Sequence, residues 1–329
     1  MSGNTAPPTI PRKFLLSFVL VTILFALWGF ANDITNPLVA AFKDVFVINN
    51  AQSSWVQMAF YGGYGTMAIP AALFIRRYSY KAGIIIGLTL YAIGALACVP
   101  AANMASFNLF LIALYILTFG LAFLETTANP YILSMGPPET ATRRLNLAQA
   151  FNPVGSLTGM AVASLFILSN LQVEDFRSDF TGHRIDQGIV QTVDLEHEVL
   201  PFLQARDRVP VNDAVLAEYV RANPEAGLDQ VLADYKAGKL ENFMGLNHRE
   251  LQANDLDIIA TPYRVIGLIV IAVLLLFLIN KLPKTTTGED EREHSTLREI
   301  LARLAKNPLY LSGILAQMFY VGAQIMCWT

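Results

Sequence analysis

Two acidic residues lie inside apolar stretches that are long enough to cross a membrane. Glu125 is in the run 107–135, and Asp33 is in the run 14–42. About 20 apolar residues span the hydrocarbon core of a bilayer, and a charge near its centre costs roughly 2.5–3.5 kcal/mol even on lenient insertion scales. Each acid is therefore a candidate for binding and releasing a proton. The alternative is a structural acid that stays protonated or is paired with a neighbouring helix.

An Asn-Pro pair follows each acid within five residues, and a third such pair lies further along the chain. The prolines are Pro37, Pro130 and Pro153. Proline has no N–H, so it leaves the carbonyl group four residues back without its helical partner. The carbonyls released in this way belong to Asp33, Thr126 and Gln149. Interrupted helices point to the central site of a transporter, although proline is also simply common in membrane helices.

The composition is that of an integral membrane protein. Of the 329 residues 54% are hydrophobic and 15% are charged, well below the roughly 25% charged residues of soluble domains. Both cysteines, Cys98 and Cys327, lie in apolar runs, so no disulfide framework is indicated. The first apolar run carries Asp33 and no small-residue cleavage site, which favours a membrane span over a signal peptide.

The apolar runs predict seven membrane spans. They cover residues 14–42, 51–75, 81–102, 107–135, 145–170, 262–282 and 309–329. Basic residues gather before the first span and in the connectors between spans two and three, four and five, and six and seven. By the positive-inside rule these connectors and the N-terminus are cytoplasmic. We expect a multi-pass protein of the plasma membrane, which is the inner membrane in a bacterium.

The spans divide the chain into five parts. Residues 1–170 hold spans one to five of an N-terminal bundle, 171–261 form a large periplasmic or extracellular loop, 262–282 are span six, 283–308 are a cytoplasmic linker, and 309–329 are span seven. Apolar spacing predicts short helices at 212–220 and 227–235. Since the sequence stops at the edge of the seventh run, we expect a fragment that lacks a C-terminal bundle and does not transport alone.

Polar residues recur along one face of four predicted spans. They are Trp28, Asn32 and Asn36; Gln57, Tyr61 and Tyr64; Glu125 and Asn129; and Asn146, Gln149, Asn152 and Ser156. Residues three or four apart share a helix face. Amides and carboxylates can bind sugar hydroxyls, and an indole can stack on a sugar ring, so these faces predict a hydrophilic sugar cavity. For any single amide the alternative is an interhelical hydrogen bond, worth about 0.6 kcal/mol.

The two acids are expected at different depths. Each lies about ten residues before the end of its span, and spans one and four run in opposite directions. Asp33 should therefore lie toward the outside and Glu125 toward the inside. An outer and an inner carboxylate suit stepwise proton movement, and a proton that crosses the whole membrane gains about 2.3 kcal/mol per 100 mV of membrane potential, which can drive a neutral solute uphill.

The sequence resembles the fucose permease group, the sugar–proton symporters of the major facilitator superfamily. The resembling segments are Leu27-Trp28 with Ala31-Asn32, 59–62 with 69–71, 78–83, 124–126 with 128–130, 144–149 with 151–152, 261–263, and Tyr320 to Gln324. The resemblance implies an all-α membrane fold of twelve spans in two six-helix bundles, with alternating access. It also implies import of L-fucose or a related hexose with a proton. Glu125 matches the inner carboxylate of the family, and Gln149 matches its span-five amide.

The sequence departs from the family pattern in two places. In that pattern span one carries Asn first and Asp three residues later, whereas here Asp33 comes first and Asn36 second. Either position therefore remains open as the proton-coupling one. The loop 171–261 is also longer than in the pattern. Gln324 stands where related glucose/galactose carriers tend to have Glu, which favours fucose-like substrates slightly.

These observations define the expected site. The proton-coupling candidates are Asp33 and Glu125, and the sugar-binding candidates are Trp28, Asn32, Asn36, Tyr61, Asn129, Gln149, Asn152 and Gln324. The expected partners are a monosaccharide, a proton, the lipid bilayer and the missing C-terminal bundle. A proton-independent sugar facilitator remains an alternative, as does a sugar sensor that uses the outer loop.

Two other classes of protein are disfavoured. An enzyme would need a nucleophile, a base or a metal cluster within the membrane, but all four histidines lie in predicted loops. No span holds a pair of residues with metal-ligand spacing, so we expect no metal and no cofactor. Nucleic-acid binding has no basic patch in the sequence to support it, and the net charge of −3 says little because the charges lie in loops.

Overall fold

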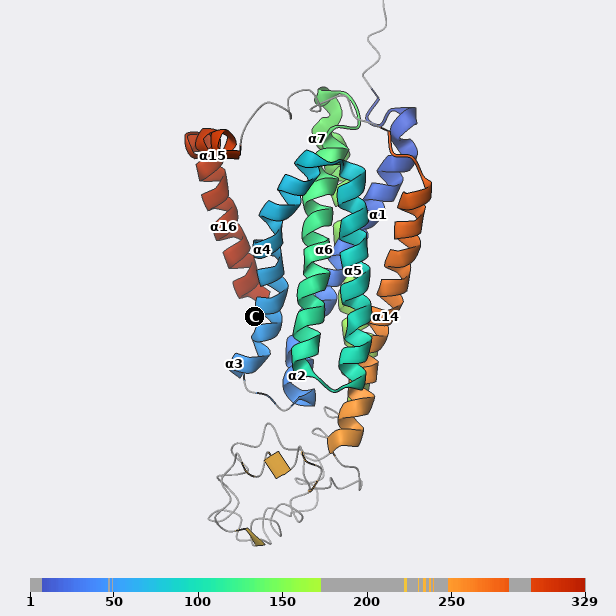
Figure 1. Cartoon of the computed structure of the whole chain (residues 1–329), viewed down its shortest axis with the longest axis vertical. Coiled ribbons are helices and arrows are strands. Elements are labelled where there is room, and N and C mark those ends of the chain that lie inside the picture. Colours follow the sequence, from blue (N-terminus) through green and yellow to red (C-terminus); the bar gives the residue numbers. More distant parts are fainter. Residues whose placement is uncertain are drawn as a thin grey trace, which may run out of the picture. The chain divides into compact units, whose positions relative to one another are not determined.

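The computed structural model of the chain is built from helices, and the described residues contain no strand (Figure 1). It describes residues 8–172 except 47 and 49, a few positions between 222 and 239, residues 248–283, and residues 297–328. The chain divides into two units, Met1–Pro283 and Lys284–Thr329. The expected all-α membrane fold is therefore confirmed.

Six helical segments of the described chain are long and apolar enough to cross a membrane. They are Arg12–Thr35, Ala51–Arg77, Tyr80–Asn103, Phe107–Leu133, Pro138–Asn170 and Arg249–Ile279. The helices within them are α1 (Leu15–Thr35), α3 (Asn50–Ser53), α4 (Trp55–Arg77), α5 (Tyr80–Asn103), α6 (Phe107–Leu133), α7 (Ala141–Gln149), α8 (Asn152–Val162) and α14 (His248–Ile279). Short 3-10 helices at Arg12–Phe14, Pro138–Thr140 and Leu168–Asn170, and a π-helix at Ala163–Ile167, complete the first and fifth segments.

The Asn-Pro pairs have different structural effects. The first ends α1 at Thr35, and α2 (Leu38–Val45) begins just after it. The third separates α7 from α8, where Pro153 occupies the first turn, a position that needs no N–H donor. Pro130 does not break α6, which continues to Leu133. The predicted interruption is thus seen in the first and fifth segments, while in the fourth the proline lies in the last turn.

The helices of the first unit pack in pairs. Helix α6 lies between α4 and α5, and α14 packs on α5 (Figure 1). Helix α1 packs on α8. Helices α1 and α8 approach each other closely because each contributes a glycine to the contact. A Cβ atom at Gly155 would overlap the carbonyl group of Ala26, and one at Gly29 would overlap that of Asn152. Small residues of this kind allow membrane helices to approach to backbone contact.

Helix α14 begins well before the sixth predicted span. It starts at His248, whereas the hydropathy pattern indicates 262. Its first turns pack on the rest of the unit: Leu251 is fully buried, and the Gln252 amide donates to the carbonyl of Val45 (2.9 Å). The buried Asp255 accepts from the backbone N–H of Gln172 (2.8 Å). These contacts continue the helix beyond the apolar stretch that the sequence indicates.

Two further predictions concern the predicted outer loop and the C-terminal part of the chain. The short helices expected at 212–220 and 227–235 lie outside the described residues, apart from isolated positions in the second. The second unit contains α15 (Leu297–Ala305), within the predicted linker, and α16 (Pro308–Trp328), within the predicted seventh span. Gln324 belongs to α16, and its side chain is not described.

Candidate functional site

Glu125 lines a pocket between α4 and α6. The pocket has a volume of about 340 Å³. Its lining residues are Tyr64, Ala68, Ala122, Glu125, Thr126, Asn129 and Pro130. Because Pro130 has no N–H, the Thr126 carbonyl at this pocket lacks its helical donor. The pocket therefore joins a carboxyl group, an amide, a phenol and a released carbonyl within an otherwise apolar helix pair.

An amide chain leads from this pocket to α7. The Gln149 amide donates from Nε2 to the Asn129 Oδ1 atom (3.3 Å). Asn129 in turn donates from Nδ2 to the backbone carbonyl of Glu125 (3.1 Å). Asn129 thus links Gln149 to the backbone of Glu125. In the sequence, these two residues match the amide and the carboxylate of the family pattern. The two helices place these side chains together because the hairpin between α6 and α7 is short.

The hairpin is held by a buried arginine. Arg144 is fully buried and donates to the carbonyls of Ile132 (3.2 Å) and Leu133 (2.8 Å) at the end of α6. It also donates to the carbonyl of Pro137 and to the Thr140 hydroxyl (2.7 Å). The last carbonyls of a helix have no intrahelical partner, so Arg144 satisfies them and sets the position of α7 and Gln149.

Tyr64 links the pocket to α1. Its hydroxyl donates to the Asn32 Oδ1 atom (3.4 Å), and its ring lines the Glu125 pocket. One turn earlier on α1, the indole Nε1 of Trp28 is buried and has no hydrogen-bond acceptor in the described part of the chain. Buried donors are almost always paired. Trp28 therefore offers an unused donor on the same face of α1 as Asn32.

Asp33 forms a second polar site. It is buried, with 5% of its surface exposed, and Oδ1 accepts from the Nδ2 of Asn36 (3.4 Å). The two residues that exchange places relative to the family pattern are thus hydrogen-bonded neighbours at the C-terminal end of α1. Neither is among the residues that line the Glu125 pocket. The two acids accordingly belong to separate polar groups.

Two of the expected sugar-binding residues have other surroundings. The Asn152 amide donates to the carbonyl of Phe25 (3.2 Å) and ties α8 to α1. Tyr61 is 37% exposed, and its ring packs edge-on against Phe60 with 5.7 Å between centroids. Asn152 thus makes the interhelical hydrogen bond that was the alternative for a single amide.

The comparisons with known proteins agree with the helical arrangement. Residues 18–180 match the family described as Major Facilitator Superfamily. The L-fucose-proton symporter of Haemophilus influenzae is 46% identical over 320 residues, which cover 97% of this chain and 61% of that protein. The L-fucose-proton symporter of Escherichia coli is 31% identical over 319 residues, which cover 97% of this chain and 59% of that protein.

This chain is similar to the major facilitator superfamily over residues 18–180. The crystal structure of the Escherichia coli fucose:proton symporter superposes on it with a TM-score of 0.64 at 30% identity, covering 96% of this chain and 62% of that one. A glucose/galactose transporter of Brucella abortus is 41% identical over 158 residues, 48% of this chain and 38% of that protein. The expected likeness to fucose permeases is thus confirmed. The chain spans about three fifths of the length of these symporters.

Within this helical bundle, two polar contacts were not expected from the sequence. Tyr64 belongs to the polar face predicted on the second span, but its bond to Asn32 depends on how α4 approaches α1. The hydroxyls of Thr66 and Tyr115 lie 2.9 Å apart and join α4 to α6. Tyr115 carries no sequence signal of its own, because it stands alone among apolar residues.

Proposed function

We propose that the complete protein imports a monosaccharide, L-fucose or a related hexose, together with a proton by alternating access. The observation that carries the proposal is the Glu125 pocket, in which a carboxyl group and the Asn129–Gln149 amide pair adjoin. The L-fucose-proton symporters with 46% and 31% identity support the substrate class. The proposal includes no enzymatic activity and no cofactor.

Each polar side chain of the site has a role that follows from its chemistry. Glu125, which lines the pocket between α4 and α6, takes up and releases the proton. Asn129 and Gln149 bind sugar hydroxyls, since an amide offers both a donor and an acceptor. The unused Nε1 donor of Trp28 binds a further hydroxyl, and Asn32 and Tyr64 hold this part of α1 against α4.

Asp33 and Asn36 provide the second proton site. Asn36 donates to the Asp33 carboxylate, and such a bond favours the charged form. When Asp33 takes up a proton, its carboxyl group becomes neutral and the burial of that group becomes less costly. The exchange of Asp and Asn relative to the family pattern moves the acid by one turn on the same face. We therefore assign outer proton coupling to the Asp33–Asn36 pair as a unit.

The membrane potential supplies enough energy for this cycle. One proton gains about 2.3 kcal/mol per 100 mV, and about 1.4 kcal/mol corresponds to a tenfold ratio of concentrations. One proton per sugar thus supports accumulation of roughly 50-fold per 100 mV. The sugar itself is neutral, so all of the electrical work is done on the proton.

We further propose the orientation and setting of the chain. The protein lies in the plasma membrane, the inner membrane of a bacterium, with its N-terminus in the cytoplasm. Basic residues support this orientation, including Lys81, which donates to the carbonyls of Leu278 (3.3 Å) and Asn280 (3.0 Å) at one end of the bundle. We assign residues 283–308 to the link between this bundle and a second one in the complete protein.

Uptake by the complete protein in proteoliposomes tests the proposal. Labelled L-fucose, galactose and glucose are offered with and without an inward proton gradient, and external pH is recorded. Accumulation that requires the gradient and makes the external medium more alkaline supports symport. Uptake that equilibrates without responding to pH would select the facilitator instead, and binding of sugar to residues 171–261 without uptake would select a sensor.

A further inference from the structure

A long apolar groove lies on the first unit, away from the Glu125 pocket. It is formed by α1, α8 with the π-helix after it, and α14, and its volume is about 830 Å³. Leu27 and Phe30 line it from α1, Val154 and Val162 from α8, and Val265 and Ile269 from α14. Val154 and Val265 are more than half exposed in the bundle. A groove of this composition in a membrane protein is suited to an acyl chain.

The length of the groove matches one leaflet of a bilayer. Its lining on α14 runs from Asp257 to Ile269, which is about 18 Å at the rise of an α-helix. The hydrocarbon core of a bilayer is about 30 Å thick, so one leaflet contributes roughly 15 Å. The groove is therefore long enough to hold a chain over the full depth of a leaflet.

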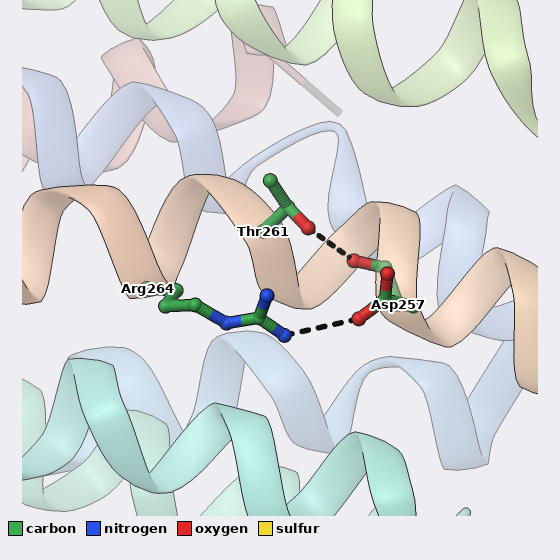
Figure 2. Close-up of polar contacts among 3 residues, drawn as sticks. All are labelled: Asp257, Thr261 and Arg264. Carbon is green, nitrogen blue, oxygen red and sulfur yellow. Dashed lines mark hydrogen bonds and ion pairs between the residues drawn. The ribbon is translucent and has the colours of Figure 1, made fainter.

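The polar end of the groove carries an ion pair (Figure 2). Arg264 donates from Nη2 to Oδ1 of Asp257 (3.0 Å), and the Thr261 hydroxyl donates to the Asp257 backbone carbonyl (2.8 Å). Asp257 and Thr261 line the groove. Arg264 is not a lining residue, but it is hydrogen-bonded to Asp257. The Arg264 and Asp257 side chains are 44% and 65% exposed. Both charges are thus accessible to a molecule that enters the groove.

The depth of the ion pair places it at a membrane interface. Helix α14 ends at Ile279, where Lys81 binds the last carbonyls. Asp257 lies about 33 Å and Arg264 about 22 Å along the helix from that end. With a core of about 30 Å, Asp257 reaches the opposite interface. The guanidinium of Arg264 extends toward Asp257, as a cation does when it reaches for the headgroup level.

We propose that this groove binds a phospholipid whose zwitterionic headgroup carries a primary ammonium. Arg264 makes one hydrogen bond, to Asp257, within the described chain, so most of its five N–H donors remain for a phosphate, which guanidinium binds in a bidentate way. Asp257 accepts that bond on Oδ1 and has a second oxygen for the N–H donors of an ammonium. A quaternary ammonium has no N–H, and an anionic glycerol headgroup has no cation for Asp257.

Native mass spectrometry of the complete protein tests the lipid site without reference to transport. The protein is exchanged into equimolar phosphatidylethanolamine, phosphatidylcholine and phosphatidylglycerol, and retained lipid is counted. We expect retention of the ethanolamine lipid to exceed that of the other two by roughly two- to fivefold, the range of a partly exposed ionic contact. Equal retention of all three lipids would overturn the proposal.

Five variants assign the effect to the groove. Asp257→Asn and Arg264→Gln should each abolish the headgroup preference, while Arg264→Lys should retain part of it. Val265→Trp should reduce retention of all three lipids by filling the groove, whereas Leu268→Trp, which is 58% exposed and outside the lining, should not. A preference that survives Asp257→Asn, or equal effects of the two Trp variants, would contradict the assignment. Melting curves of each variant confirm that the comparison is between folded proteins.

Discussion

The Gln149 side chain donates a hydrogen bond to Asn129 across the α6–α7 hairpin, with 3.3 Å between Nε2 and Oδ1. Asn129 lies one helical turn after Glu125 and binds its backbone carbonyl. This relationship connects the Glu125 backbone in the fourth membrane segment to an amide of the fifth. It also gives the amide pair a defined geometry next to the proposed proton site.

The first prediction concerns Glu125. Glu125→Gln in the complete protein should abolish accumulation of sugar against a gradient while leaving sugar exchange active, because an amide keeps the shape of the pocket but carries no exchangeable charge. The accumulation ratio should fall from roughly 50-fold per 100 mV to about one. Glu139→Gln, in the Pro138–Thr140 turn outside the pocket, is the control. Retained accumulation in Glu125→Gln would make this acid structural.

The second prediction concerns the pair on α1. Asp33→Asn should remove proton-dependent accumulation, and the exchanged variant Asp33→Asn with Asn36→Asp should restore part of it, because the acid then returns to its place in the family pattern on the same helix face. Uptake is measured against external pH for the three proteins. If Asp33→Asn still accumulates sugar, Asp33 takes no part in coupling.

The third prediction concerns the amide pair. Asn129→Ala and Gln149→Ala should each raise the apparent KM for sugar, by about 3- to 10-fold for the loss of one or two hydrogen bonds. A double-mutant cycle should show coupling, because the two side chains share one bond. Strictly additive effects on ΔG would indicate that the residues act independently.

The fourth prediction concerns the unused donor of Trp28. Trp28→Phe keeps an aromatic ring but removes Nε1–H, so it should weaken sugar binding by about 3- to 10-fold, as expected for one hydrogen bond. Trp55→Phe is the matched control, since Trp55 is 53% exposed at the start of α4. Binding is measured by isothermal titration or tryptophan quenching. Equal affinities of wild type and Trp28→Phe would remove Trp28 from the sugar site.

The fifth prediction concerns the close contact of α1 and α8. Gly155→Ala should lower the melting temperature of the purified protein, because a Cβ atom there overlaps the backbone of Ala26. Overpacking of this kind costs about 1–3 kcal/mol. Gly65→Ala meets open space and should be neutral or slightly stabilising. Similar melting temperatures for the two variants would contradict the proposed packing.

Much of the fold followed from the sequence because membrane insertion imposes simple local rules. Backbone groups in lipid must be satisfied within each segment, so an apolar run of about 20 residues becomes a helix whatever its neighbours. This is why the hydropathy pattern predicted the helical fold. It did not predict that α14 begins at His248, because that extension depends on contacts with Val45 and Gln172.

The sequence by itself determined which polar residues lie within apolar helices and which of them share a helix face, since both depend only on residue type and helical spacing. It could not determine which faces meet. The tertiary structure decided that Gln149 reaches Asn129, that Tyr64 reaches Asn32, and that Asn152 binds the α1 backbone instead. Contacts between helices depend on their approach and rotation, which small residues such as Gly155 permit and a linear pattern does not encode.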